Sequence, residues 1–433
     1  MTHELQSLHK PHTETAILQM EQTGQKVGGL FVTRYIASLI GIWLALLTPL
    51  SVTIAIRVGQ IDPAGKATSL ALVASVGAAA SLFANPIFGA LSDRSTSRFG
   101  QRRPFILGGV SVGALAVIGV GFAPNIWLVA VMWAIAQTAF NAAIAATIAI
   151  LPERVPSKLR GRVSGFMGMT TQVGVVGGVF MSQLLGTQGA AMFIAPAVVG
   201  VLLVLPFALT LREVPKTKNE VPRTSILTIF AAFWINPLKN RDFALAWIGR
   251  FFVWIALYLL TTYKTYFLID HLGYNTSNVA PILTIAMFVL AVCIAASSIP
   301  GGWLSDKLNR RKPFVVTAAL LFVVAMTIVA FSTTVEMFIL GIAIAGLANG
   351  LYLGVDYALV AQVLPNVGSE AAKGMGVFNL SSTIPQTIAP IIAPMLLTIA
   401  ATPGSGNYTS LYLCAAVLAL IGAGFTQMLR SIH

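Results

Sequence analysis

Two ionisable residues, Arg250 and Asp356, lie well inside long apolar stretches of the sequence. Each stands eight residues from the nearer polar boundary of its stretch, at Asp242 and Leu364 respectively. That is ~12 Å along a helix that rises about 1.5 Å per residue. A charge at this depth in an apolar medium is costly unless it is paired or faces a cavity. We therefore predict an ion pair between Arg250 and Asp356, with Asp356 as the candidate proton-coupling residue.

A third deep charge, Lys264, follows Arg250 in the same apolar stretch. It would lie ~21 Å further along the helix than Arg250, too far to be the partner of Asp356. Long lysine side chains near the end of a membrane helix commonly extend their ammonium group to the interface. We expect Lys264 to reach the opposite membrane interface and to have a modest role.

Polar and aromatic side chains accompany Arg250 and Asp356 at intervals of three and four residues, which places them on shared helix faces. The candidate substrate-binding residues are Arg250, Trp254, Tyr258, Asn349, Tyr352, Asp356, Gln137, Asn141, Asn379 and Gln386. Aromatic rings combined with hydrogen-bonding groups suit a small polar or amphipathic ligand. For the four amide residues a packing role stays equally open, because amide side chains in apolar helices often join neighbouring helices.

The residues that usually build catalytic or metal centres are scattered. None of the five histidines lies in the middle of an apolar stretch, and Cys293 and Cys414 lack metal-ligand spacing. We expect no enzyme activity, no cofactor and no bound metal.

The elements that must position these residues are transmembrane helices. The 433 residues are 56% hydrophobic and only 9% charged, whereas roughly 25% are charged in soluble domains. A bilayer core of ~30 Å needs about 20 apolar residues per helix. Twelve such runs occur, near 32–56, 67–91, 104–122, 126–150, 162–185, 188–211, 243–269, 278–301, 313–331, 336–363, 373–399 and 408–430. The predicted fold class is an all-α integral membrane protein.

The net charge of +13 follows the membrane topology and does not indicate nucleic acid as a partner. Of the 27 basic residues, all but Arg57, Lys66, Arg250 and Lys264 fall on the tails or on the even-numbered loops. Basic residues gather on the cytoplasmic side of membrane proteins. Both termini are therefore expected in the cytosol, with residues 1–27 forming a cytosolic tail without a cleavable leader.

The sequence repeats itself at a shift of 213 residues. Gly89 matches Gly302, and Asp93 matches Asp306. This repeat predicts two pseudo-symmetric six-helix bundles, at 28–211 and 243–433, joined by a polar, proline-containing cytoplasmic linker at 212–242.

Two loops at matching positions carry a glycine, an acid and a basic cluster. The first reads GALSDRSTSRFGQRRPF from Gly89 to Phe105, and the second reads GGWLSDKLNRRKPF from Gly301 to Phe314. Glycine lets helices approach closely, and arginine can bind helix carbonyl ends or carboxylates of the other half. The candidate gating residues are Asp93, Arg94, Arg102, Arg103, Asp306, Lys307 and Arg311. The alternative is that the basic residues only set the membrane topology.

These loops resemble the signature of the major facilitator superfamily, and the resemblance covers nearly the whole chain. The long form of the first loop, together with GMGVFNLSSTIPQ from Gly374 to Gln386, is similar to sucrose transporters and the glycoside-pentoside-hexuronide group. The superfamily resemblance implies that helices one, four, seven and ten line a central cavity. The fourth helix differs from that of sucrose transporters, since 134–150 carries no charge.

The resemblance implies a secondary active transporter that moves a small polar or amphipathic solute by alternating access. A sugar or glycoside is the candidate solute, and a proton or another cation is the candidate coupling ion. The expected setting is the cytoplasmic or plasma membrane, with the lipid bilayer and the small-molecule substrate as partners of a monomer. Export of drug-like or amphipathic compounds stays open as an alternative, as does a receptor or scaffold of the same fold that does not transport.

Overall fold

The computed structural model describes residues 27–185, 189–213, 241–275, 278–308, 310–363, 371–401 and 406–429. The expected tail at 1–27 and the expected linker at 212–242 fall mostly outside these ranges. Every regular element in the described ranges is helical. The all-helical fold class predicted from the apolar runs is confirmed.

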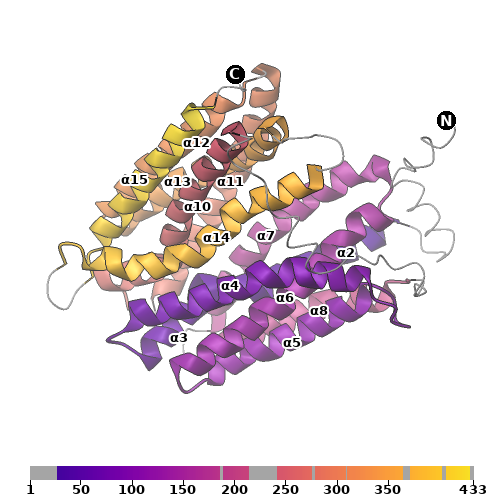
Figure 1. Cartoon of the computed structure of the whole chain (residues 1–433). Helices are drawn as coiled ribbons and strands as arrows, with labels where there is room; N and C mark the ends of the chain where they lie inside the picture. Colours follow the sequence, from indigo (N-terminus) through magenta and orange to yellow (C-terminus); the bar gives the residue numbers. More distant parts are fainter. Residues whose placement is uncertain are drawn as a thin grey trace.

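The N-terminal half contains six helical crossings (Figure 1). The first consists of α2 (Gly29–Thr48), a π-helical turn η1 (Pro49–Thr53) and α3 (Ile54–Ile61). The others are α4 (Lys66–Asp93), α5 (Arg103–Phe122), α6 (Ile126–Arg154), α7 (Ser157–Leu185) and α8 (Ala191–Thr210).

The C-terminal half repeats this order. Its first crossing consists of α10 (Arg241–Tyr266) and the π-helical turn η3 (Phe267–His271). The others are α11 (Val279–Leu308), α12 (Lys312–Ala330), α13 (Val335–Val363), α14 (Ala371–Thr398) and α15 (Tyr408–Gln427). Across the described residues, eleven of the twelve crossings are long and apolar enough to span a bilayer, and α7 is the twelfth.

Local sequence explains where several of these helices begin and bend. The side chains of Asn125 and Asn407 accept hydrogen bonds from backbone N–H groups in the first turns of α6 and α15. Pro49 has no N–H group to donate to the preceding turn, and the chain forms the π-helical turn η1 there. The first crossing therefore continues through a proline without ending.

The two halves are built by the same packing scheme. In the N-terminal half α2 packs on α7 and α8, α4 packs on α6, and α5 packs on α6 and α8. In the C-terminal half α10 packs on α14 and α15, α11 packs on α13, and α12 packs on α13 and α15. The 213-residue sequence repeat thus corresponds to a structural repeat.

Glycine pairs allow close helix contacts at equivalent crossings in each half. A Cβ atom on Gly41 of α2 would lie 2.6 Å from the carbonyl oxygen of Gly200 on α8. A Cβ atom on Gly422 of α15 would lie 2.8 Å from the carbonyl oxygen of Gly249 on α10. Small residues at such crossings let backbones approach each other in membrane proteins.

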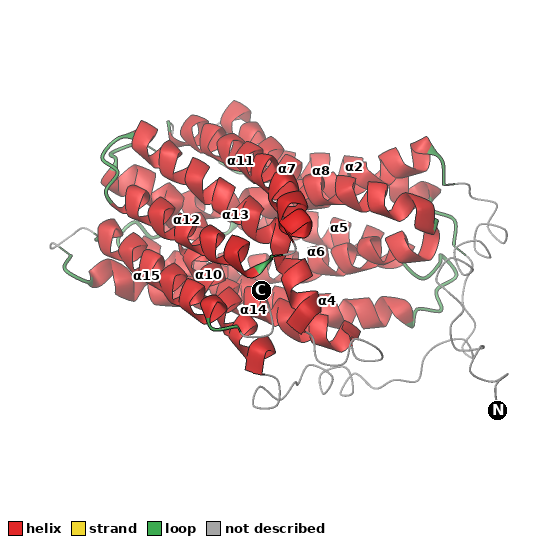
Figure 2. Cartoon of the chain, turned by 90° about the horizontal axis from the view of Figure 1, so that it is seen from above, coloured by secondary structure: helices red, strands yellow, loops and turns green. Residues whose placement is uncertain are grey.

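The halves meet through α4 with α14 and α7 with α11 (Figures 1 and 2). We call the end of the bundle that contains Arg102 the Arg102 end and the opposite end the Asp270 end. Hydrogen bonds between the halves gather towards the Asp270 end. There Tyr266 donates to the carbonyl oxygen of Ala55 at 2.8 Å, and Tyr263 donates to that of Ala67 at 3.1 Å.

Lys66 and Asp270 form an ion pair across the halves at the same end. The Lys66 Nζ atom also lies 5.3 Å from the ring centroid of Tyr266. At the Arg102 end, the ion pairs among the described residues join groups of one half only. Figure 1 shows the two bundles inclined to each other, which agrees with close contact between the halves at one end only.

Candidate functional site

Arg250 and Asp356 form a buried ion pair between α10 and α13. The Arg250 Nη1 atom donates to the Asp356 Oδ2 atom, and each side chain is 2% exposed. The predicted pairing of these two residues is confirmed. The pair lies within the C-terminal half, so its formation does not depend on contact between the halves.

Aromatic rings enclose the Arg250 guanidinium. Its Cζ atom lies 4.4 Å from the ring centroid of Phe378 on α14 and 5.8 Å from that of Trp254 on its own helix. Arginine stacks favourably on aromatic faces, and the attraction is larger when water is excluded. These rings help to offset the cost of keeping a guanidinium away from water.

Other predicted residues belong to this cluster or border it. Tyr352 lies one turn before Asp356 on α13, and its hydroxyl group interacts electrostatically with the Asp356 carboxylate. The rings of Trp254 and Tyr258 lie 5.5 Å apart. Asn349 is half-buried two turns before Asp356. We call Arg250, Trp254, Tyr258, Tyr352, Asp356 and Phe378 the α10–α13 cluster.

Gln137 and Asn141 form a separate pair on α6 of the N-terminal half. The Asn141 Nδ2 atom donates to the backbone oxygen of Gln137 at 2.8 Å and to its Oε1 atom at 3.3 Å. Gln137 is buried and Asn141 is half-buried. The hydrogen bonds stay within one helix, so these amides do not join neighbouring helices through them.

Asn379 and Gln386 lie on α14, which packs against both α10 and α4. Asn379 is exposed and Gln386 is half-buried. Asn379 directly follows Phe378, which contacts Arg250. Of the two amides, Asn379 is therefore the one that lies next to a member of the α10–α13 cluster along the chain.

Lys264 departs from its expected position. The side chain is only 2% exposed, and its Nζ atom donates to the backbone oxygen of Thr261 at 2.5 Å. The neighbouring residues Leu260, Tyr263 and Phe267 are also buried. The expectation that Lys264 reaches the membrane interface is wrong, because this part of α10 is enclosed by other helices.

A second charged cluster lies at the Arg102 end. Arg102 is 4% exposed and binds Asp93, the last residue of α4, at 2.5 Å. The same guanidinium pairs with Glu153 of α6 and donates to Ser92. One arginine thus ties the end of α4 to the end of α6, in the basic loop that the sequence singled out.

Glu213 completes this cluster from the segment after α8. Its carboxylate accepts hydrogen bonds from the backbone N–H groups of Arg102 and Arg103 at 2.9 to 3.1 Å, where α5 begins. Free N–H groups at a helix start favour a negative charge. Burial nevertheless dominates and raises the pKa of Glu213, while the two backbone hydrogen bonds and Arg154 oppose that rise.

The other candidate gating residues described next lie at or near the ends of α4, α11 and α12. Arg94 follows the end of α4, and Arg311 precedes α12. The Lys307 Nζ atom lies 4.9 Å from the ring centroid of the exposed Trp303. Asp306 lies in α11, and its side chain falls outside the described residues.

The sequence suggested that the loop arginines bind the opposite half. For Arg102 that expectation is wrong: Ser92, Asp93 and Glu153 all belong to its own half. The reason is geometric, since the ends of α4 and α6 enclose Arg102 within the N-terminal bundle. At this end the cluster stabilises one bundle and does not fasten the two bundles together.

Sequence reasoning missed Phe378, Glu153 and Glu213. Phe378 is separated from Arg250 by 128 positions, and no local spacing connects them. Glu153 stands beside Arg154 at the end of α6, and an acid next to several basic residues was the available signal. Trp247 and Phe251, which stack at 5.4 Å, extend the aromatic face of α10 at helical spacing that was visible in the sequence.

The fold and the buried pair together define a class: a polytopic helical membrane protein made of two repeated bundles, with a paired intramembrane charge on facing helices. A model of the Major Facilitator Superfamily matches residues 27–296 and 282–431. The chain belongs to this superfamily.

Individual relatives are distant. An uncharacterised transporter of this type from Schizosaccharomyces pombe is 26% identical over 191 residues, which is 43% of this chain and 41% of that protein. The chain therefore spans less than half the length of that relative.

Solved structures show the same fold. A mutant of the nucleoside transporter NupG superposes with a TM-score of 0.74 at 15% identity, covering 92% of this chain and 100% of that chain. A bacterial homologue of the human lysosomal transporter Spinster reaches 0.67 at 17% identity, over 98% of both chains. A D-xylose-proton symporter reaches 0.68 at 14% identity, over 93% of this chain and 98% of that chain.

Proposed function

We propose that this chain is a proton-coupled secondary transporter for a small polar or amphipathic solute, with sugars, glycosides and nucleosides as the first candidates. The buried Arg250–Asp356 pair carries this proposal. Intramembrane charge pairs commonly mark ion and substrate pathways. Structural relatives named as a nucleoside transporter and a xylose-proton symporter motivate the solute classes.

The α10–α13 cluster has the chemistry for such a ligand. Trp254 and Tyr258 offer rings on which a sugar or a base can pack, and Arg250 offers donors in a planar fork. The Trp254 Nε1 atom is buried and has no hydrogen-bond partner in the part of the chain that the structure describes. A solute with a hydrogen-bond acceptor would satisfy it after a small side-chain movement. Asn379 and Gln386 on α14, and Gln137 and Asn141 on α6, are proposed as further contacts.

In the coupling step Asp356 carries the proton, and Arg250 competes with that proton for the Asp356 carboxylate. While the pair is closed, Arg250 satisfies the carboxylate and disfavours its protonation. Solute binding draws Arg250 away, and the exposed carboxylate accepts one proton from the side to which the cavity is open. After reorientation the solute leaves, Arg250 returns, and the proton is released to the other side.

We further propose that the Arg102 end faces the cytosol and that the chain works as a monomer. Arg94, Arg98 and Arg310 lie in loops at the Arg102 end and Arg103 begins α5 there, whereas Arg57 in α3 and Lys66 at the start of α4 flank the first loop at the Asp270 end. Contacts between the halves gather at the Asp270 end, which supports a conformation that is closed there and opens at the Arg102 end. The loop residues Asp93, Arg94, Arg102 and Arg103 would keep the N-terminal bundle rigid as it rocks.

Reconstituted vesicles test the function directly. Purified protein in liposomes would be given an imposed pH gradient and a panel of radiolabelled sucrose, xylose, uridine and a lipophilic cation. We expect saturable accumulation of one polar solute, abolished by a protonophore. Accumulation of the lipophilic cation alone would point to drug export. Specific binding of a panel member without any flux would point to a receptor, and either result would overturn the proposal.

A further inference from the structure

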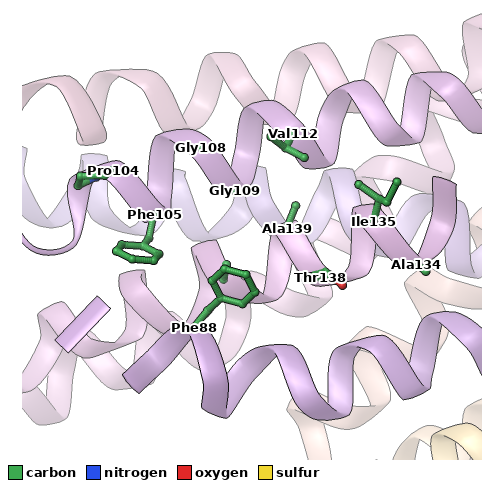
Figure 3. A pocket seen from close by; sticks show the side chains of 11 residues that line it. Phe88, Pro104, Phe105, Gly108, Gly109, Val112, Ala134, Ile135, Thr138 and Ala139 are labelled. Carbon is green, nitrogen blue, oxygen red and sulfur yellow. The ribbon is translucent and has the colours of Figure 1, made fainter. Parts of the chain in front are cut away.

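A hollow runs along the outside of the N-terminal half between α4 and α5. Both helices pack on α6, which forms its floor, and Figure 3 shows side chains from all three helices around it. Its volume is 440 Å³, within the range of roughly 300–1,000 Å³ of small-molecule sites. We call it the α4–α5 groove.

The walls of the α4–α5 groove are apolar. Phe88, Phe105, Val112, Ile135 and Ala139 contribute to the lining, and Thr138 is the one hydroxyl-bearing residue among the lining residues. Val112 is 48% exposed and Ile135 is 39% exposed, so the groove is open to its surroundings. Since α4, α5 and α6 are all apolar spans, those surroundings are the hydrocarbon part of the bilayer.

The second half carries a matching hollow, which we call the α11–α12 groove. It lies between α11 and α12 on a floor of α13 and has a volume of 310 Å³. Leu347 and Leu351 line it at the positions that correspond to Ala134 and Thr138 under the 213-residue shift. The hollow is therefore a repeated feature of the architecture and not an accident of packing in one place.

Both grooves end beneath basic residues at the Arg102 end. The loop that joins α4 to α5 contains Arg94 and Arg98, and Arg103 directly precedes Pro104, which lines the groove. Among the described residues, no carboxylate forms an ion pair with Arg94, Arg98 or Arg103. Of the acids at this end, Asp93 and Glu153 are already paired with Arg102, and Glu213 accepts hydrogen bonds from the backbone N–H groups of Arg102 and Arg103.

The α11–α12 groove has the same arrangement. Lys312 directly precedes the lining residue Pro313, and Lys307 and Arg310 are exposed close by in the sequence. Each groove thus combines an apolar channel at membrane depth with positive charge at one end.

We propose that each groove binds one anionic phospholipid, with an acyl chain along the apolar channel and the headgroup phosphate held by the basic loop. Anionic lipids are attracted to basic residues at the membrane surface, and basic pockets between membrane helices bind lipid headgroups. A free anion would use the basic loop but would leave the apolar channel empty. Because α4 also packs on α14 of the other half, a lipid seated in the α4–α5 groove contacts a helix that moves during alternating access.

Substitutions to phenylalanine inside and outside the grooves separate a seated lipid from general lipid contact. Gly108 lines the α4–α5 groove, and a Cβ atom there meets nothing within 4 Å, so Gly108→Phe fills the groove without a backbone clash. Ser111→Phe is the matched control, because Ser111 is exposed on the same helix but does not line the groove. Thr317→Phe fills the α11–α12 groove in the same way.

The assay counts retained lipids by native mass spectrometry. Full-length protein would be reconstituted in vesicles with equal amounts of phosphatidylglycerol and phosphatidylcholine of the same chain length, then extracted into mild detergent. The wild-type protein should retain up to two phosphatidylglycerol molecules, at least about fivefold over phosphatidylcholine. Gly108→Phe and Thr317→Phe should each lose one, and Ser111→Phe should lose none.

Two results would overturn the proposal. Equal retention of phosphatidylglycerol and phosphatidylcholine by the wild-type protein would show that the headgroup is not recognised. Equal retention of phosphatidylglycerol by Gly108→Phe and Ser111→Phe would show that the lipid does not bind in the α4–α5 groove. If Gly108→Phe is not monodisperse, Val112→Trp replaces it, since Val112 also lines the groove. Arg98→Gln with Arg103→Gln should lower the preference for phosphatidylglycerol while the groove stays intact, and an unchanged preference would contradict the assigned headgroup contact.

Discussion

At the scale of single residues, the environment of Arg250 explains how a charge persists inside the bundle. The guanidinium pairs with Asp356, lies over Phe378 and contacts Trp254. Removing one member of a buried ion pair leaves the other charge unpaired, which typically costs about 3–5 kcal/mol, whereas removing both members together is often far less costly. The pair is therefore expected to behave as a unit.

We predict that Arg250→Gln lowers the free energy of unfolding by about 3–5 kcal/mol and that Arg250→Gln combined with Asp356→Asn restores a large part of the loss. Thermal unfolding of the detergent-solubilised variants measures both. Additive losses in the double variant would mean that the two residues are energetically independent, contrary to the structure.

Glu213 shows a conflict between burial and hydrogen bonding. Its pKa is raised because burial outweighs the backbone hydrogen bonds from Arg102 and Arg103. A carboxyl group whose pKa is higher in the folded state stabilises that state least when it is ionised. Its contribution is complete below the ordinary value of 4.5 and is lost as the pH rises through the raised folded-state pKa.

Glu213→Gln should therefore become more stable relative to the wild-type protein as the pH rises from about 4 to 8, and the two should converge at low pH. Unfolding temperatures measured across this range provide the test. Divergence in the opposite direction, with the wild-type protein gaining at high pH, would show that the hydrogen bonds to α5 outweigh burial.

At the scale of elements, the apolar runs predict the helices well because membrane spans depend on local composition. The runs at 104–122 and 336–363 differ from α5 and α13 by one residue at their starting ends. Larger differences arise where polar residues remain helical. The run at 278–301 stops before Ser305 and Asp306, yet α11 continues to Leu308, because polar residues end an apolar run without ending a helix.

Contacts between helices were harder to predict from the sequence than the helices themselves. The depth argument brought Arg250 and Asp356 together, because both charges needed a partner at one level. The same argument failed for Lys264, since depth alone does not say which face of α10 is enclosed. Lys66 and Asp270 are far apart in the sequence, and only the packing of the two halves brings them into contact.

Lys66 and Asp270 provide the element-scale prediction. Both side chains are about one-quarter exposed, and such pairs contribute roughly 0–1 kcal/mol, which changes a population by a factor of about 5 at most. In a background where Cys293 and Cys414 are replaced, spin labels at the exposed positions Gln60 and His271 would report the separation of the halves.

We predict that Lys66→Gln increases the long-distance population in this measurement modestly and that Arg57→Gln, on α3 before the same loop, has little effect on it. Arg57 is the control because it donates to the carbonyl oxygen of Ala123 within its own half. An identical distance distribution in Lys66→Gln and the unmodified background would exclude a role for the ion pair in holding this end closed.

At the scale of the whole molecule, the two halves contain different groups of charged residues. The N-terminal half contains a charge cluster that ties its own helices together at the Arg102 end. The C-terminal half contains the buried pair on α10 and α13. The halves contact each other mainly through α4 with α14 and α7 with α11. Rocking of the halves about these helices would alternate access to the α10–α13 cluster.

The most direct test of the account is transport by Asp356→Asn in proteoliposomes, with the solute that the wild-type protein accumulates. We predict that proton-driven accumulation is abolished while exchange of labelled for unlabelled solute continues, because the amide cannot carry the proton but can still accept a hydrogen bond from Arg250. Glu336→Gln is the control, an exposed acid at the start of the same helix, and it should retain both activities. Uphill accumulation at the wild-type level in Asp356→Asn would contradict the assignment of Asp356 as the proton-coupling residue.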